Sequence, residues 1–328
     1  MKFMRMVRAA SILGRARLLK QRIPFAVSWA LSYRCNARCA YCRIYRGATA
    51  ELNTDDVCRV IDRLIIEGMC RLSFTGGEPL LREDIDTIVG YTCRKNVFTS
   101  LSTNGILVPE KISVLKHLDR IGLSLDGSEN VNDRLRGEGS YRYVLEALQV
   151  LRRTDVQRIL HVVLSRGNVH DFEHVLDVAA QYNAKVFFQP GTIHLLGTVE
   201  ENPEALGEAE YKVVIDKLIA MKKKGVSYIA NSLAGLRHLS YWPHPQAIFC
   251  SAGSLFQRIE PDGSMRGCSR KGLGTISCPD RLSPQGRRSM PAAVAQKNCR
   301  SCWCAPLVEY NLALSFNSSA IRNVLQKI

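Results

Sequence analysis

The stretch Cys35-Asn36-Ala37-Arg38-Cys39-Ala40-Tyr41-Cys42 places three cysteines in one short loop, and it comes soon after the apolar run Phe25–Leu31. Three thiolates cannot complete a tetrahedral zinc site by themselves, because structural zinc takes four protein ligands. They are enough for a cubane iron–sulfur cluster whose fourth iron stays open to a small molecule. The loop therefore indicates an iron–sulfur cluster, with a generic zinc loop or unrelated free cysteines as the alternative.

Short apolar runs typical of β-strands alternate along the chain with stretches of helical spacing. The runs are Phe25–Leu31, Leu72–Phe74, Phe98–Leu101, Ile121–Leu125, Leu160–Leu164 and Val186–Phe188. Helical spacing is clearest around Val57–Ile65, Val144–Leu151 and Val175–Ala179, and the region 205–224 is expected to be the last barrel helix. Strands that alternate with helices indicate a parallel sheet, here a partial (β/α)6, TIM-like barrel. Its chemistry is expected at the C-terminal ends of the strands.

Three further polar motifs fall at the ends of successive predicted strands. They are Thr75-Gly76-Gly77-Glu78-Pro79, Ser102-Thr103-Asn104-Gly105 and Ser124-Leu125-Asp126-Gly127, and Asn132-Asp133-Arg134-Leu135-Arg136-Gly137 trails the last of them. Each motif alone would be an ordinary turn. Their order matters, because the C-terminal strand ends of a barrel meet at one site.

Together the cysteine loop and these motifs resemble the radical S-adenosylmethionine (SAM) superfamily over residues 24–232. The resemblance implies a 4Fe–4S cluster on Cys35, Cys39 and Cys42, with SAM bound at its open iron. It also implies reductive cleavage of SAM to a 5′-deoxyadenosyl radical, which takes a hydrogen atom from a substrate C–H bond. A flavodoxin- or ferredoxin-type protein would supply the electron.

The resemblance also assigns roles around SAM. Gly76 and Gly77 would let the backbone approach the methionine ammonium, and Glu78, followed by Pro79, would accept its charge. Arg136 would hold the methionine carboxylate, with Arg134 as the alternative. The remaining expected neighbours of the adenine, the ribose or the substrate are Tyr41, Ser102, Asn104, Ser124 and Asp126.

A second group of cysteines lies near the end of the chain, at positions 250, 268, 299, 302 and 304. A hairpin is expected between Phe256–Ile259 and Met265–Gly267, and it would bring Cys250 and Cys268 together. A zinc ribbon is one interpretation of such cysteine pairs. Behind a radical SAM barrel, the pattern resembles the twitch or SPASM extensions that hold auxiliary 4Fe–4S clusters.

One auxiliary 4Fe–4S cluster is expected, on Cys250, Cys268, Cys299 and Cys302. No cysteine follows Cys304, so the seven-cysteine set for two auxiliary clusters is not filled. Cys304 itself would replace Cys302 as a ligand, act catalytically as a hydrogen donor, or be inert. No role is assigned to Cys58, Cys70, Cys93 and Cys278.

Other polar residues carry weaker signals. Gln189 and His194 are interpreted as loop residues rather than substrate contacts, and Glu309 and Tyr310 likewise rather than as residues facing a cavity between clusters. His161, His170 and His174 are interpreted as surface or core residues without a functional role.

The composition excludes several classes of protein. Of the 328 residues 46% are hydrophobic and 23% are charged, which excludes a disordered chain. No run is long and apolar enough for a transmembrane helix or a signal peptide, so a cytoplasmic location is expected, where clustered thiols bind metal. Of the +15 net charge, seven units lie in residues 1–22 and seven in residues 245–328, so nucleic-acid binding at the barrel is not expected.

Three segments are expected: an N-terminal helix (1–23), the barrel (24–232) and an auxiliary-cluster domain (233–328). In the first, Phe3, Val7, Ala10, Gly14 and Leu18 form an apolar stripe. Packing against the barrel is favoured for this stripe over peripheral contact with a membrane. With no domain before the first strand, we expect no peptide-recognition module.

The favoured function is dehydrogenation or epimerisation of a small-molecule, sugar or lipid-linked substrate, assisted by the auxiliary cluster. The alternative within the superfamily is modification of a peptide or protein. The alternative of another class is a non-catalytic zinc or iron–sulfur protein, against which the motif at Gly76–Glu78 counts.

Overall fold

The computed structural model describes residues 2–18, 21–246, 248–268, 302–315 and 317–325. One sheet organises the chain, with the strand order β6-β5-β4-β3-β2-β1-β7-β8. Its first six strands are β1 (Ala26–Ser32), β2 (Arg71–Gly76), β3 (Phe98–Thr103), β4 (Arg120–Ser124), β5 (Gln157–Leu164) and β6 (Lys185–Pro190). Each of these six pairs in parallel with its neighbour, and all six strands predicted from the sequence are confirmed.

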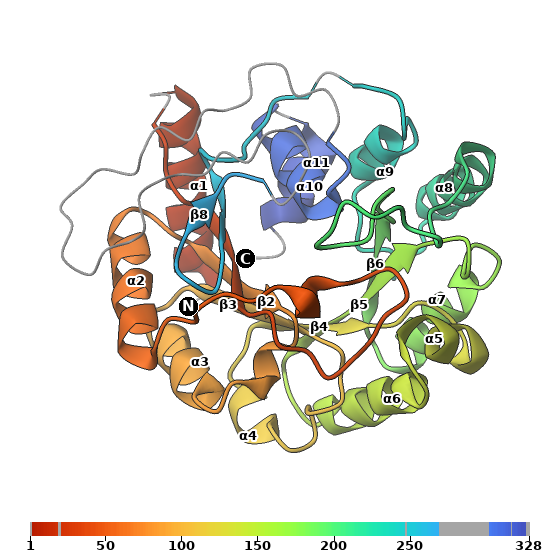
Figure 1. The fold of residues 1–328 in the computed structure, drawn as a ribbon. Coiled ribbons are helices and arrows are strands. Elements are labelled where there is room, and N and C mark those ends of the chain that lie inside the picture. The colour runs from red at the N-terminus through yellow and green to blue at the C-terminus, as the bar shows by residue number, and fades with distance from the viewer. Residues whose placement is uncertain (1, 19–20, 247, 269–301, 316, 326–328) are drawn as a thin grey trace.

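Helices follow each of these strands and cover the outside of the sheet (Figure 1). They are α2 (Thr54–Ile66), α3 (Ile85–Arg94), α4 (Ile112–Leu115), α5 (Glu129–Arg136), α6 (Ser140–Leu151), α7 (Phe172–Gln181) and α8 (Glu208–Lys223). Local signals set their ends: the Asn53 side chain caps α2 by accepting a hydrogen bond from the backbone of Asp56 at 2.9 Å. The predicted partial (β/α)6 barrel is confirmed.

The predicted hairpin forms, but it belongs to the barrel sheet. Strand β7 (Phe256–Ile259) pairs in parallel with β1, with Ala26 opposite Phe256 and Trp29 opposite Ile259. Strand β8 (Met265–Arg266) then pairs antiparallel with β7. The hairpin expected within a separate C-terminal domain therefore extends the sheet to eight strands.

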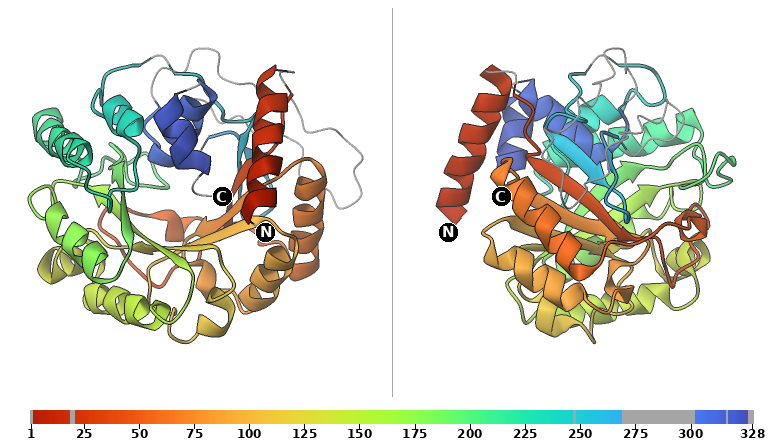
Figure 2. Two further views of the ribbon diagram at one scale, coloured as in Figure 1. Left: turned by 180° about the vertical axis from the view of Figure 1, so that it is seen from behind. Right: turned by 60° about the vertical axis from the view of Figure 1, so that its left-hand side comes forward.

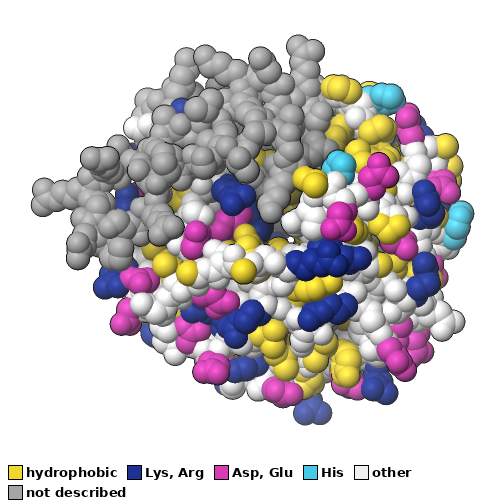
Figure 3. All heavy atoms as spheres, viewed as in Figure 1, with side chains coloured by type: hydrophobic (Ala, Val, Ile, Leu, Met, Phe, Trp, Pro, Cys, Tyr) yellow, Lys and Arg dark blue, Asp and Glu magenta, His cyan; other side chains and the backbone are white. Residues whose placement is uncertain are grey.

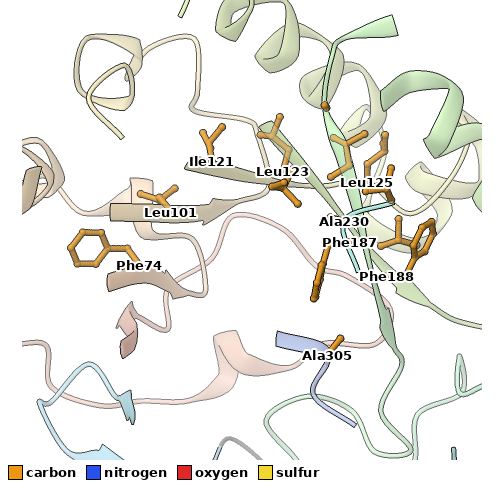
Figure 4. Close-up of a cluster of buried hydrophobic side chains, with 14 of the residues drawn as sticks. Phe74, Leu101, Ile121, Leu123, Leu125, Phe187, Phe188, Ala230 and Ala305 are labelled. Carbon is orange, nitrogen blue, oxygen red and sulfur yellow. The ribbon is translucent and has the colours of Figure 1, made fainter. Parts of the chain in front are cut away.

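The two faces of the sheet differ in character. Because side chains alternate along a strand, Leu101, Ile121, Leu123 and Leu125 all lie on the face that the helices cover, and they are buried there (Figure 4). The opposite, inner face carries small polar residues that are only half-buried. These include Ser73, Ser100, Ser102 and Ser124. The barrel interior is therefore polar toward the strand ends.

Three helices complete the C-terminal part of the described chain: α9 (Leu233–Leu239), α10 (Ala305–Leu314) and α11 (Ser318–Leu325). Helix α10 contacts α9, α11 and strand β6. Tyr310 of α10 packs against the rings of Phe25 and Phe256, with centroid distances of 6.3 and 6.2 Å. Helix α10 thus joins β6, at one edge of the sheet, to β7, near the other.

The N-terminal helix α1 (Lys2–Leu18) packs on the N-terminal ends of strands β1 and β2, as predicted, and runs beside α10 (Figure 2). Ala9, Ile12 and Ala16 are the buried residues, whereas Val7 of the predicted apolar stripe is 53% exposed. The predicted apolar stripe is therefore not the buried face of α1, and this prediction was wrong. Arg5 lies toward the protein and pairs with Asp119 at 2.6 Å, because a long side chain can bury its stem while its charge finds a partner. No helix in the described ranges is long and apolar enough to cross a membrane.

We predict that Ala9→Glu lowers the free energy of unfolding by about 3 kcal/mol, because it buries an unpaired charge against Phe25 and Leu314. Ala10→Glu, one residue along on the exposed side of α1, is the matched control and should change it by less than about 0.5 kcal/mol. Urea unfolding of both variants measures the difference. Equal effects would mean that α1 does not pack as described.

Candidate functional site

The cysteine loop, residues 33–43, follows β1 and carries Cys35, Cys39 and Cys42, all half-buried. A turn in which the Cys42 N–H donates to the carbonyl of Cys39 at 3.1 Å shapes the loop. Two donors already point at the sulfurs: the Ala37 N–H lies 3.4 Å from Cys35 Sγ, and Arg136 Nη1 lies 3.9 Å from Cys39 Sγ. Hydrogen bonds to sulfur are what stabilise thiolate ligands of iron–sulfur clusters.

Without metal, the thiols of Cys35 and Cys42 hold their protons more tightly than an ordinary cysteine does. Burial raises the pKa of the Cys35 thiol, and it raises that of Cys42 to about 11, with the neighbouring cysteine thiols adding to both shifts. Such thiols bind metal only by releasing their protons. Within the described part of the chain no three His, Cys, Asp or Glu side chains converge on one metal ion. A cubane takes one thiolate per iron, so its cysteines need not converge on a single point.

Two arginines hold the carbonyl groups of the loop, and the sequence analysis missed both. Arg43 Nη1 donates to the carbonyls of Cys39, Ala40 and Cys42 at 2.9–3.3 Å. Arg38 Nη1 donates to those of Cys35 and Ala37 at 2.7 and 2.9 Å. Basic side chains accordingly gather over the loop in the middle of the face seen in Figure 3. The sequence signal that could have found these two arginines is their position, since Arg38 lies between Cys35 and Cys39 and Arg43 directly follows Cys42.

Two glycines at the end of β2, Gly76 and Gly77, lie directly against the backbone at the start of the cysteine loop. A Cβ on Gly76 would lie 2.2 Å from the Ser32 carbonyl oxygen, and one on Gly77 would lie 2.2 Å from that of Arg34. Gly76 also has φ of 136°, which disfavours any residue with a side chain. The backbone N–H groups of Gly77 and Glu78 donate to Ser32 and Arg34, both at 2.8 Å. This contact between two backbones is a role that the sequence analysis did not assign.

The Glu78 carboxylate is 1% exposed and lies between the ends of β2 and β3. It accepts hydrogen bonds from the backbone N–H groups of Leu80 at 3.1 Å and Asn104 at 2.8 Å. Desolvation by burial nevertheless raises its pKa to about 7. Pro79 begins the short 3-10 helix that follows it, η2 (Pro79–Leu81). The Asn104 side chain reaches the cysteine loop, where its amide donates to Asn36 Oδ1 at 2.7 Å.

Tyr41, Asp126 and Arg136 form a buried network beside Cys39. The Tyr41 hydroxyl donates to Asp126 Oδ2 at 2.5 Å, and Arg136 Nε donates to the same oxygen at 2.8 Å. Asp126 Oδ1 accepts from the Val163 backbone at 2.9 Å. Burial opposes the charge on Arg136, but Asp126, Tyr41 and Cys39 together outweigh it and raise the pKa of Arg136. Asp126 therefore positions Tyr41 and Arg136.

Arg134 lies elsewhere: its side chain is 54% exposed, and it donates to the Gly167 carbonyl at 2.8 Å. Of the two predicted arginines, only Arg136 adjoins the cysteine loop. Asp133 of the same motif caps α6 by accepting from Gly139, Ser140 and Tyr141 at 2.7–3.0 Å.

Ser102 and Ser124 lie half-buried on the inner face of the barrel, as expected for residues near a substrate. His161 shares that face, because it stands opposite Ser124 in the register of β4 and β5. A Cβ on Gly122 would lie 2.5 Å from His161 Nε2. His161, interpreted from the sequence as a surface or core residue, therefore lines the barrel interior.

The second cysteine group is described in part. Cys302 is buried, Cys250 and Cys304 are half-buried and Cys268 is exposed, whereas Cys278 and Cys299 lie outside the described residues. Gln189 of β6 brackets Cys304: its Nε2 donates to the Trp303 carbonyl at 2.8 Å, and its Oε1 accepts from the Ala305 N–H at 2.7 Å. Gln189 is thus an anchor for this segment, a role that its interpretation as a loop residue did not include.

His238, Glu309 and Tyr310 also have structural roles. His238 Nε2 lies 3.1 Å from the Cys302 carbonyl oxygen, and its ring packs on Trp303. The buried Glu309 accepts from the Ser232 N–H at 2.7 Å, directly before α9. Glu309 therefore connects α10 to the start of α9, and Tyr310 packs on Phe25 and Phe256. His194 is exposed, in line with its interpretation.

Residues 29–179 match the radical SAM superfamily. This part of the chain is a radical SAM domain. The cysteine loop and Gly76–Glu78 lie within the matched residues. The prediction of the superfamily is confirmed, and with it SAM and an iron–sulfur cluster as the cofactors that it implies.

The curated relatives resemble this chain over part of their own length. The mycofactocin maturase MftC of Mycolicibacterium smegmatis is 33% identical over 171 residues, which are 49% of this chain and 43% of the maturase. The AdoMet-dependent heme synthase of Methanosarcina barkeri is 29% identical over 215 residues, 61% of this chain and 59% of the synthase. The chain thus spans about half the length of these relatives.

Solved structures share the fold. SuiB of Streptococcus suis bound to S-adenosylmethionine has a TM-score of 0.64 and 16% identity, and the match covers 77% of this chain and 63% of SuiB. The protein anSMEcpe with bound AdoMet has a TM-score of 0.61 and 20% identity, covering 76% of each chain. At these identities, the likeness extends to the arrangement of strands and helices.

We predict that Glu78 makes the stability of this radical SAM protein depend on pH in the metal-free state. Its pKa is about 7 in the folded chain against an ordinary 4.5, so the folded state binds the proton more tightly. The stabilisation is present below pH 4.5 and is lost as pH rises through 7, by up to about 3 kcal/mol. Glu78→Gln should remove this dependence.

Urea unfolding at pH 5, 6.5 and 8 measures the effect as the difference between wild type and Glu78→Gln. Glu83→Gln is the control, because Glu83 is exposed near the same loop, and it should follow wild type. A constant difference between wild type and Glu78→Gln across this range would contradict the assigned pKa.

Proposed function

We propose that the chain is a radical SAM enzyme that abstracts a hydrogen atom from a C–H bond of a peptide substrate. The observation that carries the chemistry is the meeting of Cys35, Cys39 and Cys42 with Glu78 and Arg136 at the C-terminal strand ends. A peptide is favoured by the relation to MftC, called a maturase, and by the fold shared with SuiB, solved with its precursor peptide SuiA. This choice replaces the small molecule expected from the sequence.

In this proposal the chain's own residues hold SAM. Glu78 is buried and accepts hydrogen bonds from two backbone N–H groups. It would ionise beside the methionine ammonium, because a cation in contact favours the charged form of a carboxyl. Arg136, oriented by Asp126, would bind the methionine carboxylate. Tyr41, Ser102, Asn104 and Ser124 would surround the nucleoside and the substrate. When bound on Cys35, Cys39 and Cys42, the cluster supplies the electron that cleaves SAM to a 5′-deoxyadenosyl radical.

We further propose one auxiliary 4Fe–4S cluster on Cys250, Cys268, Cys299 and Cys302. Gln189 and His238, which fix the backbone around Cys302 and Cys304, support a site that is held in place before metal binds. The cluster would accept an electron from the substrate or anchor it. Cys304, bracketed by Gln189, remains the candidate for a fourth ligand or a hydrogen donor. A flavodoxin- or ferredoxin-type protein would reduce the SAM-binding cluster.

A second candidate is oxidation of a small molecule. It is favoured by the AdoMet-dependent heme synthase, whose similarity extends over more of this chain than that of MftC. Epimerisation, or a sugar or lipid-linked substrate, has no such support among these relatives.

We predict about eight irons per chain after anaerobic reconstitution, falling to about four when Cys35, Cys39 and Cys42 are all changed to Ala. SAM cleavage, measured as 5′-deoxyadenosine formed with dithionite, should disappear in the same triple variant. Cys58→Ala is the control and should keep both. About four irons falling to none would instead remove the auxiliary cluster from the proposal.

We predict that a host extract accelerates 5′-deoxyadenosine formation by the reconstituted enzyme, and that protease treatment of the extract abolishes the acceleration. The protease would cleave a peptide substrate and so abolish the acceleration, whereas it would leave a small-molecule substrate intact. The heat-inactivated protease is the control. Acceleration that resists the protease would favour the small-molecule candidate.

A further inference from the structure

We propose that Asn311 is a positioning residue of the auxiliary cluster: it ties the segments of Cys250 and Cys302 together and donates a hydrogen bond to the Cys302 sulfur. This inference rests on the auxiliary cluster proposed above. Asn311 lies on α10 and is 0% exposed. Its Nδ2 lies 3.4 Å from Cys302 Sγ, and its Oδ1 accepts from the Ser251 N–H at 2.7 Å.

The orientation of the amide follows from its two partners. The Ser251 N–H can only donate, so the oxygen of the side chain must face it. The NH2 group is then the end that faces sulfur. The Cys302 sulfur is thereby the acceptor in this contact, which is the role that it would keep as a thiolate ligand.

Burial makes the two contacts depend on each other. Asn311 lies among apolar residues of α10 such as Leu307 and Val308, where an amide without partners is costly. Both of its partners belong to cysteine-bearing segments that are far apart in the sequence. The amide is therefore satisfied only when Ser251, next to Cys250, and Cys302 are both in place.

The contact at Ser251 also orients the hairpin. The Ser251 carbonyl accepts from the N–H groups of Ser254, Leu255 and Phe256, so Ser251 begins the turn that leads into β7. At the other end of the hairpin, a Cβ on Gly267 would lie 3.0 Å from the Gly253 N. Fixing Ser251 therefore also fixes the neighbourhood of Cys268, which follows Gly267.

Two variants separate the two contacts. Asn311→Asp keeps an oxygen for the Ser251 N–H and removes the amide donor to sulfur, whereas Asn311→Leu removes both at similar volume. Asn323→Leu is the matched control, because Asn323 on the adjacent α11 donates to Glu309 and contacts no cysteine in the described residues. All three are made in full-length chain with Cys35, Cys39 and Cys42 changed to Ala, which isolates the auxiliary cluster.

Asn311→Asp should shift the midpoint potential of the cluster to more negative values, because it removes a hydrogen bond that favours the reduced cluster and adds a carboxylate that opposes reduction. Asn311→Leu, which removes the same donor without adding a charge, should shift the potential in the same direction and so isolates the effect of the hydrogen bond. Asn311→Leu should lose iron to a chelator about 10-fold faster or more. Asn323→Leu should match the background in both measurements. Asn311→Asp also keeps the question decidable if the Leu variant does not fold.

The outcomes distinguish the two proposals. A background chain that binds no iron would overturn both the auxiliary cluster and this role of Asn311. A background chain with about four irons, whose potential and iron retention are unchanged in both Asn311 variants, would overturn the role of Asn311 alone.

Discussion

The site depends on the close approach of two backbones at the ends of β1 and β2. The N–H groups of Gly77 and Glu78 donate to the carbonyls of Ser32 and Arg34, and a Cβ at position 77 would lie 2.2 Å from the latter. Only glycine leaves room for this contact. Because the contact joins the start of the cysteine loop to the residue that carries the buried carboxylate, it fixes Glu78 relative to Cys35. The register of the parallel strands then sets the positions of the residues on the inner face.

The two buried carboxylates of the site differ in their partners. Asp126 has a guanidinium partner, Arg136, and a network of three donors. Glu78 accepts from two backbone N–H groups and is hydrogen-bonded to the Thr103 side chain, with no cation beside it in the described part of the chain, and burial raises its pKa to about 7. A carboxylate that is buried without a counter-charge is poised to receive one. Among the described residues of the site, Asp126 thus has a guanidinium partner and Glu78 has none, and our proposal assigns the methionine ammonium of SAM to that position.

Local sequence signals predicted the six strands, the cysteine loop and the strand-end motifs, because each is encoded within a few residues. Contacts between distant segments were not predictable in this way. The pairing of β7 with β1, the bracket of Gln189 on Trp303 and Ala305, and the cap that Glu309 provides for α9 all join residues that are far apart in sequence. The buried face of α1 was predicted wrongly for a related reason. Small residues, Ala9 and Ala16, allow close packing there, and Arg5 turns inward to reach Asp119.

The register of the sheet connects the two cysteine groups. Gln189, which holds the segment of Cys302 to Cys304, stands opposite Val163 in the pairing of β5 with β6. The Val163 N–H binds Asp126, which orients Arg136, and Arg136 reaches Cys39. Every step in this series is a hydrogen bond or a strand pair, and no step runs through a long loop. Slipping β6 by one residue would turn Gln189 to the opposite face of the sheet and release the segment. The barrel itself therefore positions the described segment of Cys302 to Cys304 relative to the cysteine loop.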